Sequence, residues 1–241
     1  MLIKSLKQRI YEKKLRSAHV PMELKTAYDQ VKKLDTNRSI QDAGFVVIDT
    51  ETTGFHPEQG DSLLSLAAIR MVRGRVDLSE SFYELIKPDR EIPRESVKIH
   101  HLTPGILSSH PVGVLPDVLI RFFEFCGGNV LVGHHVALDL RFLNHALKQH
   151  FGAGMANPTV DTALLASAIK EMEDPVKASM QGADHVGLDD LAKEFKISMP
   201  HRHDAYGDAF ATAMIFQRQI GILRKNHVKT LKELLRLAGV D

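Results

Sequence analysis

Two acidic residues separated by one threonine follow an apolar run in the first quarter of the chain. In the stretch FVVIDTETTG, Asp49 and Glu51 come directly after four apolar residues. Side chains two positions apart on a strand point to the same face, so these two carboxylates can converge. Two ionised carboxylates about 4 Å apart repel by roughly 4 kcal/mol at an effective dielectric near 20. The pair therefore predicts a shared proton or a bound cation such as Mg²⁺ or Mn²⁺, and a solvated strand end is the alternative.

Two further stretches carry acidic residues where helices are expected to begin. In VGHHVALDLRFL, Asp139 falls in the first turn of an apolar-periodic helix, where the helix dipole alone would favour an acid. In HRHDAYGDAF, His203 and Asp208 flank the start of another helix. Five residues along one helix would separate their side chains by about 140°, so His203 can join Asp208 only from the preceding loop. Asp204 is a good N-cap residue and predicts that boundary.

The order and spacing of these three stretches resemble the three motifs of the DEDDh family of 3′→5′ exonucleases. The third stretch has the H-x-A-x-x-D form, and IHHLT, the pair Asp161 and Thr162, and LDDLAKEF are similar to that family as well. The similarity runs through residues 43–224, and the proofreading epsilon subunit of bacterial replicative DNA polymerase is a family member that the chain resembles. The resemblance implies a ribonuclease-H-like fold and the removal of nucleoside 5′-monophosphates from 3′ ends.

The resemblance also implies a site for two divalent cations, Mg²⁺ or Mn²⁺. It assigns the metal ligands to four acidic residues: Asp49, Glu51, Asp139 and Asp208. Four carboxylates and two divalent cations balance in charge, which explains how such acids can share a site. His203 is then the general base that removes a proton from the attacking water, a role that suits an unperturbed pKa of about 6.5.

Substrate contacts are implied at residues near these acids. The residues expected to contact the terminal nucleotide are Thr52, Thr53, Gly54, His100 and His134. Gly54 permits close backbone approach, while an ordinary turn is the alternative for the threonines and a satisfied structural histidine is the alternative for His100. In the second motif His135 and Val136 stand where relatives carry Asn and Ala, and Leu138 replaces a common aromatic residue. Nucleotide contacts and substrate preference are therefore not carried over from the family at these positions.

Hydrophobic periodicity predicts the elements that position these residues. Strands are expected at residues 45–48, 63–72, 76–86 and 129–133, with a hairpin that turns at Gly74. Helices are expected at residues 116–125, 137–150, 161–172, 188–195, 206–223 and 229–237. A Pro-marked loop is expected between the hairpin and the first of these helices. Antiparallel strands followed by strand–helix alternation indicate an α/β fold with a mixed sheet flanked by helices.

The pattern predicts three parts of the chain. They are a helical, basic amino-terminal extension of residues 1–40, an exonuclease domain of residues 41–224 and a helical tail of residues 225–241. Residues 1–18 carry six basic residues against one acid, Glu12, with apolar residues at helical spacing. An amphipathic helix packed on its own domain is one interpretation of this segment. A basic arm for nucleic acid, a membrane surface or a partner protein is the other.

Composition bounds the class of protein. With 241 residues, 44% hydrophobic and 25% charged, the chain can bury a sizeable core. The net charge of +1 gives no argument for nucleic acid, the single Cys126 excludes an intramolecular disulfide, and the 13 histidines show no standard zinc spacing. No apolar run reaches the roughly 18 residues of a membrane span. The charged amino terminus is unlike a signal peptide, so a cytoplasmic protein that does not enter a membrane is expected.

The leading hypothesis is a metal-dependent 3′→5′ exonuclease that acts on single-stranded or frayed DNA 3′ ends in proofreading or repair. A DNA polymerase or another replication or repair protein is the expected partner. One alternative is an RNA 3′-end trimming exoribonuclease similar to ribonuclease T. The alternative of another class is a catalytically silent nucleic-acid-binding or polymerase-interaction module. A silent module is expected to lack an acid or the histidine, yet all five positions are present.

Overall fold

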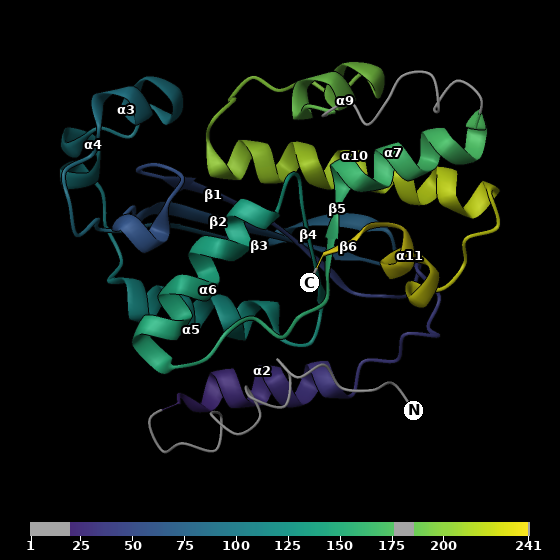
Figure 1. Ribbon diagram of the computed structural model, residues 1–241, viewed down its shortest axis with the longest axis horizontal. Helices are drawn as coiled ribbons and strands as arrows, with labels where there is room; N and C mark the ends of the chain where they lie inside the picture. Colours follow the sequence, from purple (N-terminus) through teal and green to yellow (C-terminus); the bar gives the residue numbers. More distant parts are fainter. Residues whose placement is uncertain (1–19, 176–185, 241) are drawn as a thin grey trace.

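The computed structural model describes residues 20–175 and 186–240 (Figure 1). At its centre lies a six-stranded sheet in the order β3-β2-β1-β4-β5-β6. The strands are β1 Phe45–Thr52, β2 Leu63–Val72, β3 Arg75–Leu85, β4 Val130–Gly133, β5 Thr159–Asp161 and β6 Gly239–Val240. β1, β4 and β5 are parallel, whereas β2, β3 and β6 run antiparallel to their neighbours. The predicted mixed sheet is confirmed.

Helices cover both faces of the sheet (Figure 1). One face carries α2 Met22–Lys32, α5 Leu115–Cys126 and α6 Ala137–Phe151. The other face carries α7 Thr162–Glu173, α10 Ala205–Lys225 and α11 Leu231–Ala238, with α9 Leu188–Glu194 packed on α7 and α10. The short helices α3 Arg94–His100 and α4 Pro104–Ser109 lie together at one end of the sheet, and a 3-10 helix, η1 Pro57–Gln59, follows β1.

β1 shows how the apolar run meets both layers of helices. Phe45 and Val47 pack in the cluster formed with α10 and α11, whereas Val46 and Ile48 pack in the cluster formed with α5 and α6. Phe45 meets Phe216 of α10 edge-on, with ring centroids 5.0 Å apart. A strand covered on both faces requires an unbroken apolar run. Burial then decreases over the last four residues of β1, so the strand carries polar side chains out of the core at one edge.

Several expectations about the elements are corrected. β1 continues to Thr52, beyond the predicted end at residue 48, because its last four residues still pair with β2. The predicted Pro-marked loop contains α3 and α4. Pro93 is the N-cap of α3, and Pro104 is the first residue of α4, a position that proline fits well. β5 and β6 were not predicted, because strands of three and two residues are too short to show a period. The hairpin that turns at Gly74 is confirmed. The six predicted helices are confirmed as well, with slightly shifted ends.

Both described ends of the chain contribute to the core. Leu24 and Ala27 of α2 are buried in the cluster that contains Phe122 and Phe123 of α5, which favours packing for this part of the predicted extension. The amphipathic helix or basic arm predicted for residues 1–18 lies outside the described residues. At the other end, Leu231 of α11 is buried and β6 pairs with β5. Within residues 20–175 and 186–240, no helix combines the length and apolar character that crossing a membrane requires.

Candidate active site

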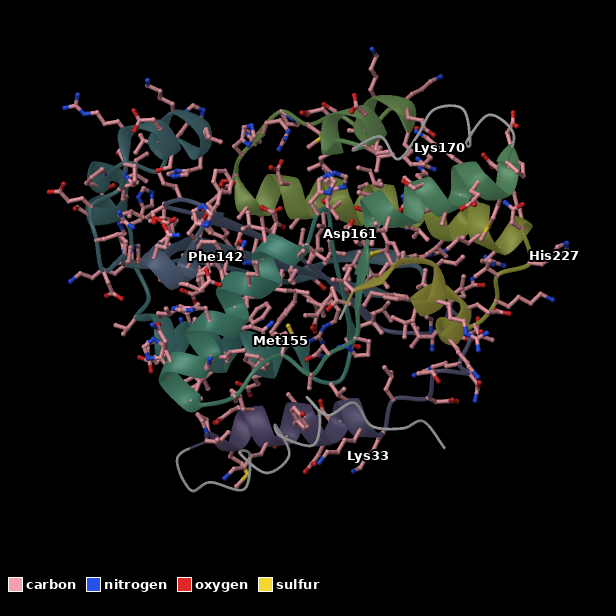
Figure 2. The ribbon with its side chains drawn as sticks, viewed as in Figure 1. Lys33, Phe142, Met155, Asp161, Lys170 and His227 are labelled. Atoms are coloured by element: carbon pink, nitrogen blue, oxygen red, sulfur yellow. The ribbon has the colours of Figure 1, made fainter. Side chains whose placement is uncertain are left out.

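The carboxyl ends of the three parallel strands meet at one edge of the sheet. β1 carries Asp49 and Glu51 there, and the chain that leaves β4 reaches Asp139 in the first turn of α6. Asp161 ends β5 at its junction with α7 (Figure 2), and Asp208 lies in the first turn of α10. In sheets of this kind, ligands bind where such strand ends meet. The topology therefore brings residues from four separate segments to one region.

Three of the predicted acids lie close together. One carboxylate oxygen from each of Asp49, Glu51 and Asp208 lies within 4.8 Å of the other two. Asp139 is outside this group of three, and its Oδ1 accepts a hydrogen bond of 2.6 Å from Thr50 Oγ1 on β1. Its charge nevertheless acts on Asp49, where it raises the pKa. We call these four residues the acid cluster, three members of which are close enough to share one cation.

The acid cluster resists ionisation. Burial raises the pKa of Glu51 to about 8 and that of Asp139 to about 7, because desolvation disfavours the charged form. Burial also raises the pKa of Asp49, and repulsion from the other three acids raises it further. Carboxylates perturbed in this way lack compensating positive charge. Such perturbation is typical of functional sites.

One arginine offsets part of this negative charge. The Arg202 guanidinium forms an ion pair with Asp208, and its Nε donates a hydrogen bond of 2.7 Å to Asp189 of α9. Burial still raises the pKa of Asp208, although Arg202 opposes this effect. The Oδ1 atom of Asp208 is buried and has no hydrogen-bond partner in the described part of the chain. Arg202 was not among the predicted site residues, although its place directly before His203 was a signal.

His203 lies in the loop before α10, as predicted. Asp204 caps the helix by accepting a hydrogen bond of 2.9 Å from the Gly207 N–H. His203 adopts a left-handed backbone conformation with φ 58°, and its N–H donates to Asp208 Oδ2 at 3.1 Å. The residue is exposed. The backbone therefore ties this loop to the acid cluster while the imidazole remains accessible.

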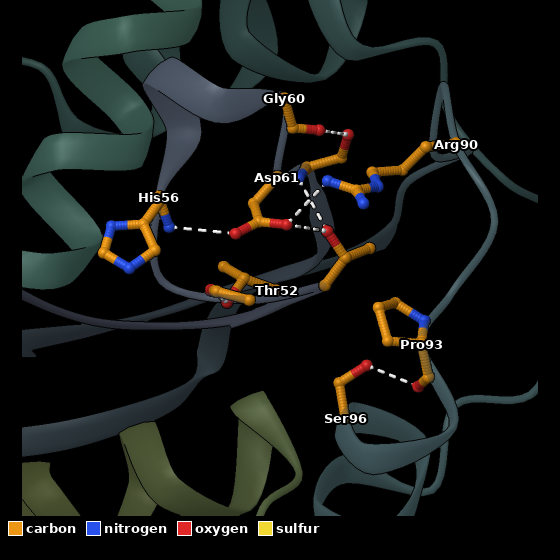
Figure 3. A network of polar contacts seen from close by, with 10 residues as sticks. Thr52, His56, Gly60, Asp61, Arg90, Pro93 and Ser96 are labelled. Carbon is orange, nitrogen blue, oxygen red and sulfur yellow. Dashed lines mark hydrogen bonds and ion pairs between the residues drawn. The ribbon is translucent and has the colours of Figure 1, made fainter.

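The residues after β1 form a compact loop, residues 53–62, drawn in Figure 3. Thr52 Oγ1 donates to the Gly54 carbonyl at 2.6 Å. Thr53 is buried, and its hydroxyl donates to Asp61 Oδ1 at 3.3 Å and accepts from the Ser62 N–H at 2.9 Å. A Cβ at Gly54 would collide with Asp61 Oδ2, so a larger residue here would displace the Asp61 carboxylate. These contacts assign structural roles to the loop residues, and their contact with substrate stays a prediction.

Two histidines were predicted to contact substrate. His100 is buried at the end of α3, and His134 is half-buried directly after β4. The Nδ1 atom of His100 accepts from the Leu102 N–H at 3.0 Å, so the proton of the neutral ring lies on Nε2. That nitrogen is buried without a partner among the described residues, and burial lowers the pKa of His100. His134 Nδ1 lies 2.9 Å from Thr162 Oγ1, and burial lowers the pKa of this ring to about 4. A buried donor without an acceptor favours a ligand at His100, which stays a prediction.

Asp161 holds the turn of the second motif. Its oxygens accept hydrogen bonds from the N–H groups of His135 at 3.3 Å, Val136 at 3.0 Å and Ala163 at 2.8 Å. His135 has φ 51°, a conformation that Asn, Asp and His tolerate better than most residues do. His135 therefore fits a position where the resemblance to the DEDDh family implies Asn. Through this turn Asp161 fixes the start of α6 and with it Asp139.

Comparison with known proteins identifies relatives of this chain. Residues 46–216 match a family model, RNase_T, described as Exonuclease. DNA polymerase III subunit epsilon of Aquifex aeolicus is 34% identical over 185 residues, which cover 77% of this chain and 84% of that protein. A DNA polymerase III subunit epsilon-like protein of Rhodobacter capsulatus is 35% identical over 193 residues. That match covers 79% of this chain, but the chain spans only 26% of the length of that relative.

Solved structures share the fold. Exonuclease I of E. coli in complex with a dT13 oligonucleotide has a TM-score of 0.65 at 20% identity, with coverage of 77% of this chain and 43% of that chain. Exonuclease X in complex with 5′ overhanging duplex DNA has a TM-score of 0.56 at 21% identity, with coverage of 80% and 98%. At these identities the likeness concerns the fold. The predicted fold class is confirmed.

Proposed function

This chain belongs to the exonuclease family that its residues 46–216 match, and from that premise we propose that it is a metal-dependent 3′→5′ exonuclease. Its proposed substrate is a single-stranded or frayed DNA 3′ end, from which it releases nucleoside 5′-monophosphates. The observation that carries the proposal is the group of Asp49, Glu51 and Asp208, whose ligand oxygens lie within 4.8 Å of one another. We assign the activity to residues 41–224, with residues 1–40 and 225–241 outside the catalytic part.

The acid cluster fits two divalent cations, Mg²⁺ or Mn²⁺. All of its donor atoms are carboxylate oxygens, the hard ligands that these ions prefer. Burial raises the pKa values of Glu51 and Asp139, so a bound cation would offset the cost of ionising them, and the unpartnered Oδ1 of Asp208 offers a free lone pair. In the proposal Asp49, Glu51 and Asp208 hold one ion, and Asp49 and Asp139 hold the other. When bound, such ions supply positive charge that activates water and stabilises a leaving oxygen.

His203 is the proposed general base. A water oxygen attacks the terminal phosphodiester phosphorus and forms the new P–O bond, and the water proton passes to the imidazole. The bond from phosphorus to the 3′ oxygen of the preceding nucleotide breaks, and that oxygen takes up a proton from solvent to become the new 3′ hydroxyl. The exposed loop that carries His203 allows the ring to reach a bound substrate, and the bond from its N–H to Asp208 keeps the loop beside the acid cluster. A positioned imidazole contributes about 10²- to 10⁴-fold to such a proton transfer.

The names of similar proteins support DNA as the substrate and a polymerase as the partner to test first. The Aquifex relative is a DNA polymerase III subunit, and the similar Exonuclease I structure holds a deoxythymidine oligonucleotide. The chain is much shorter than the Rhodobacter relative, so additional activities of that protein are not transferred. RNA trimming and a catalytically silent module are the outcomes that a substrate comparison must separate from DNA digestion.

A digestion series tests the proposal. End-labelled single-stranded DNA, duplex DNA, a duplex with a mismatched 3′ end and RNA of the same sequence are incubated with Mg²⁺, Mn²⁺ or EDTA. We expect mononucleotide release from single-stranded and mismatched DNA that requires a divalent ion. His203→Ala should lower kcat about 10²- to 10⁴-fold while circular dichroism shows an intact fold.

Four outcomes would contradict this proposal in different ways. Release of nucleotides in EDTA would exclude the metal-dependent mechanism. Faster digestion of RNA than of DNA would show that RNA, and not DNA, is the preferred substrate. Absence of nucleotide release from every substrate with either metal would indicate a silent module. Full turnover by the His203→Ala variant would remove this histidine from the mechanism.

A further inference from the structure

Asp61 is a carboxylate outside the acid cluster, and both of its oxygens accept hydrogen bonds (Figure 3). It follows Gly60 in the loop of residues 53–62, and its side chain is only 14% exposed. Its Oδ1 accepts from Thr53 Oγ1 at 3.3 Å and from Arg90 Nη1 at 2.9 Å. Its Oδ2 accepts from the His56 N–H at 3.0 Å. One carboxylate therefore joins both sides of the loop to a second segment of the chain.

The backbone that Asp61 supports is the part of the loop predicted to contact the terminal nucleotide. The Asp61 carboxylate occupies the space into which a Cβ of Gly54 would project, so it packs directly against that glycine. Thr53, which donates to the same carboxylate, is 2% exposed. Thr52 follows Glu51 as the last residue of β1, and residues 53 and 54 begin the loop. Their position relative to the acid cluster therefore depends on Asp61.

Arg90 links this loop to another segment that carries a predicted substrate residue. It lies between β3 and α3, and α3 ends at His100, whose Nε2 is buried without a partner among the described residues. The ion pair of Asp61 with Arg90 therefore fixes the loop after β1 against the segment that leads into α3. A nucleotide bound between these segments would depend on their spacing.

We propose that Asp61 is a positioning residue for the terminal nucleotide. It holds the backbone of residues 52–54 directly and the segment before α3 through Arg90. The inference rests on the proposed function, because it treats this loop as part of the substrate site. Asp61 is not a member of the acid cluster, so its loss should weaken substrate binding and leave the chemical step largely unchanged.

The other side of the same loop provides a matched control. Glu58 of η1 pairs with Arg141 of α6 at 3.0 Å, and the two side chains are 59% and 48% exposed. An ion pair this exposed contributes little to holding a loop. Removing Arg141 therefore deletes one cation beside the loop, as removing Arg90 does, without affecting the buried carboxylate.

The experiment compares Asp61→Asn, Arg90→Gln and Arg141→Gln in the full chain. Asp61→Asn keeps the size of the side chain but turns an N–H toward groups that are themselves donors. We expect KM for a single-stranded DNA oligonucleotide to rise about 10-fold in Asp61→Asn, about 3-fold in Arg90→Gln and less than about 2-fold in Arg141→Gln. The kcat and the affinity for Mn²⁺ should stay within about 2-fold of the parent in all three.

Backbone hydrogen exchange gives a readout that does not depend on nuclease activity. The His56 amide donates to Asp61, so its exchange should accelerate about 10-fold or more in Asp61→Asn and stay unchanged in Arg141→Gln. Unchanged exchange at His56 in Asp61→Asn would overturn the inference. A lower kcat at constant KM would overturn it as well, because Asp61 would then belong to the chemical step.

Failure of the inference and failure of the proposed function give different results. If the parent chain releases no nucleotides, the proposed function fails, while hydrogen exchange still decides whether Asp61 holds the loop. If Asp61→Asn does not fold, Arg90→Gln decides the inference, because its side chain is 43% exposed and its loss is tolerable to the fold. A KM of Arg90→Gln no higher than that of Arg141→Gln then overturns it.

Discussion

Asp49 and Glu51 of the acid cluster lie close to Asp61 in the sequence, but their carboxylates are in opposite electrostatic conditions. In the cluster, oxygens of three acids lie within 4.8 Å of one another, Arg202 pairs with one of these acids, and burial and repulsion raise the pKa of Asp49. In the loop, Asp61 alone accepts from a hydroxyl, a backbone N–H and Arg90. The first arrangement reduces stability until positive charge is added, whereas the second stabilises the fold by itself.

The same substitution at one acid of each region should have opposite effects on stability. At about pH 8.5, where the cluster is forced to ionise, Asp49→Asn should raise the free energy of unfolding of the metal-free protein by about 1 kcal/mol or more. Nuclease activity should fall about 10³-fold or more, because a metal ligand is lost. Asp61→Asn should lower the free energy of unfolding by about 1–3 kcal/mol, because the three donors to the carboxylate must then compete for the single uncharged oxygen that asparagine keeps.

Denaturation by urea in EDTA measures both changes, with a nuclease assay in Mn²⁺ alongside. The contrast between the two regions breaks if Asp49→Asn destabilises the metal-free protein as much as Asp61→Asn does. It also breaks if Asp49→Asn keeps full activity, since that acid would then hold no ion that the reaction needs.

The pH dependence of stability should follow the acid cluster. The pKa of Glu51 is raised from 4.5 to about 8 and that of Asp139 from 3.8 to about 7. Between the unfolded and folded pKa values the folded state binds more protons than the unfolded chain, so the free energy of unfolding falls as pH rises. In EDTA we expect Tm to decrease by about 5 °C or more between about pH 6.5 and pH 8.5. This interval lies above the usual pKa of histidine, so the lowered pKa of His134 does not oppose the change.

Mn²⁺ should remove most of this decrease, because an ion that binds only the folded state stabilises it by mass action. Thermal denaturation at a series of pH values, with EDTA and with Mn²⁺, measures both effects. A Tm in EDTA that rises over this pH interval would show that the acids ionise without a stability cost. The contrast with Asp61 would then disappear.

Local rules of sequence account for the residues of the acid cluster. Asp49 and Glu51 could be placed on one face because strand side chains alternate, and the loop position of His203 followed from the N-cap Asp204. These rules operate over a few residues, so they do not depend on the rest of the fold. Their shared role as metal ligands was implied by the resemblance to a family and did not follow from these local rules.

The contacts that hold the loops around the acid cluster were not predictable, because they join segments that are distant in the sequence. Arg90 meets Asp61 across 29 positions and Asp161 meets Val136 across 25 positions. Thr53 was predicted to contact substrate, yet its hydroxyl is turned inward toward Ser62, nine positions away. Closure of the loop determines this orientation, and no local period in the sequence encodes it.

Arg202 pairs with one acid of the cluster, Asp208, and so offsets part of its charge, whereas both oxygens of Asp61 have hydrogen-bond donors. Arg202→Gln removes the guanidinium from Asp208, so the metal-free protein should lose about 1–2 kcal/mol of unfolding free energy. The stabilisation on adding Mn²⁺ should become larger, because the cluster then has more uncompensated charge for the ion to neutralise. The difference in Tm with and without Mn²⁺ measures this change. An identical difference in parent and variant would show that Arg202 does not offset the cluster.

Asp189 should have the smallest effect of these substitutions. It accepts from Arg202 Nε at 2.7 Å, but its side chain is 69% exposed, and exposed ion pairs contribute about 0–1 kcal/mol. Asp189→Asn should therefore change Tm by about 2 °C or less, since Arg202 still pairs with Asp208. Thermal denaturation in EDTA beside Arg202→Gln checks this expectation. A loss equal to that of Arg202→Gln would mean that α9 orients the guanidinium, and Arg202 would then be held by an acid outside the cluster.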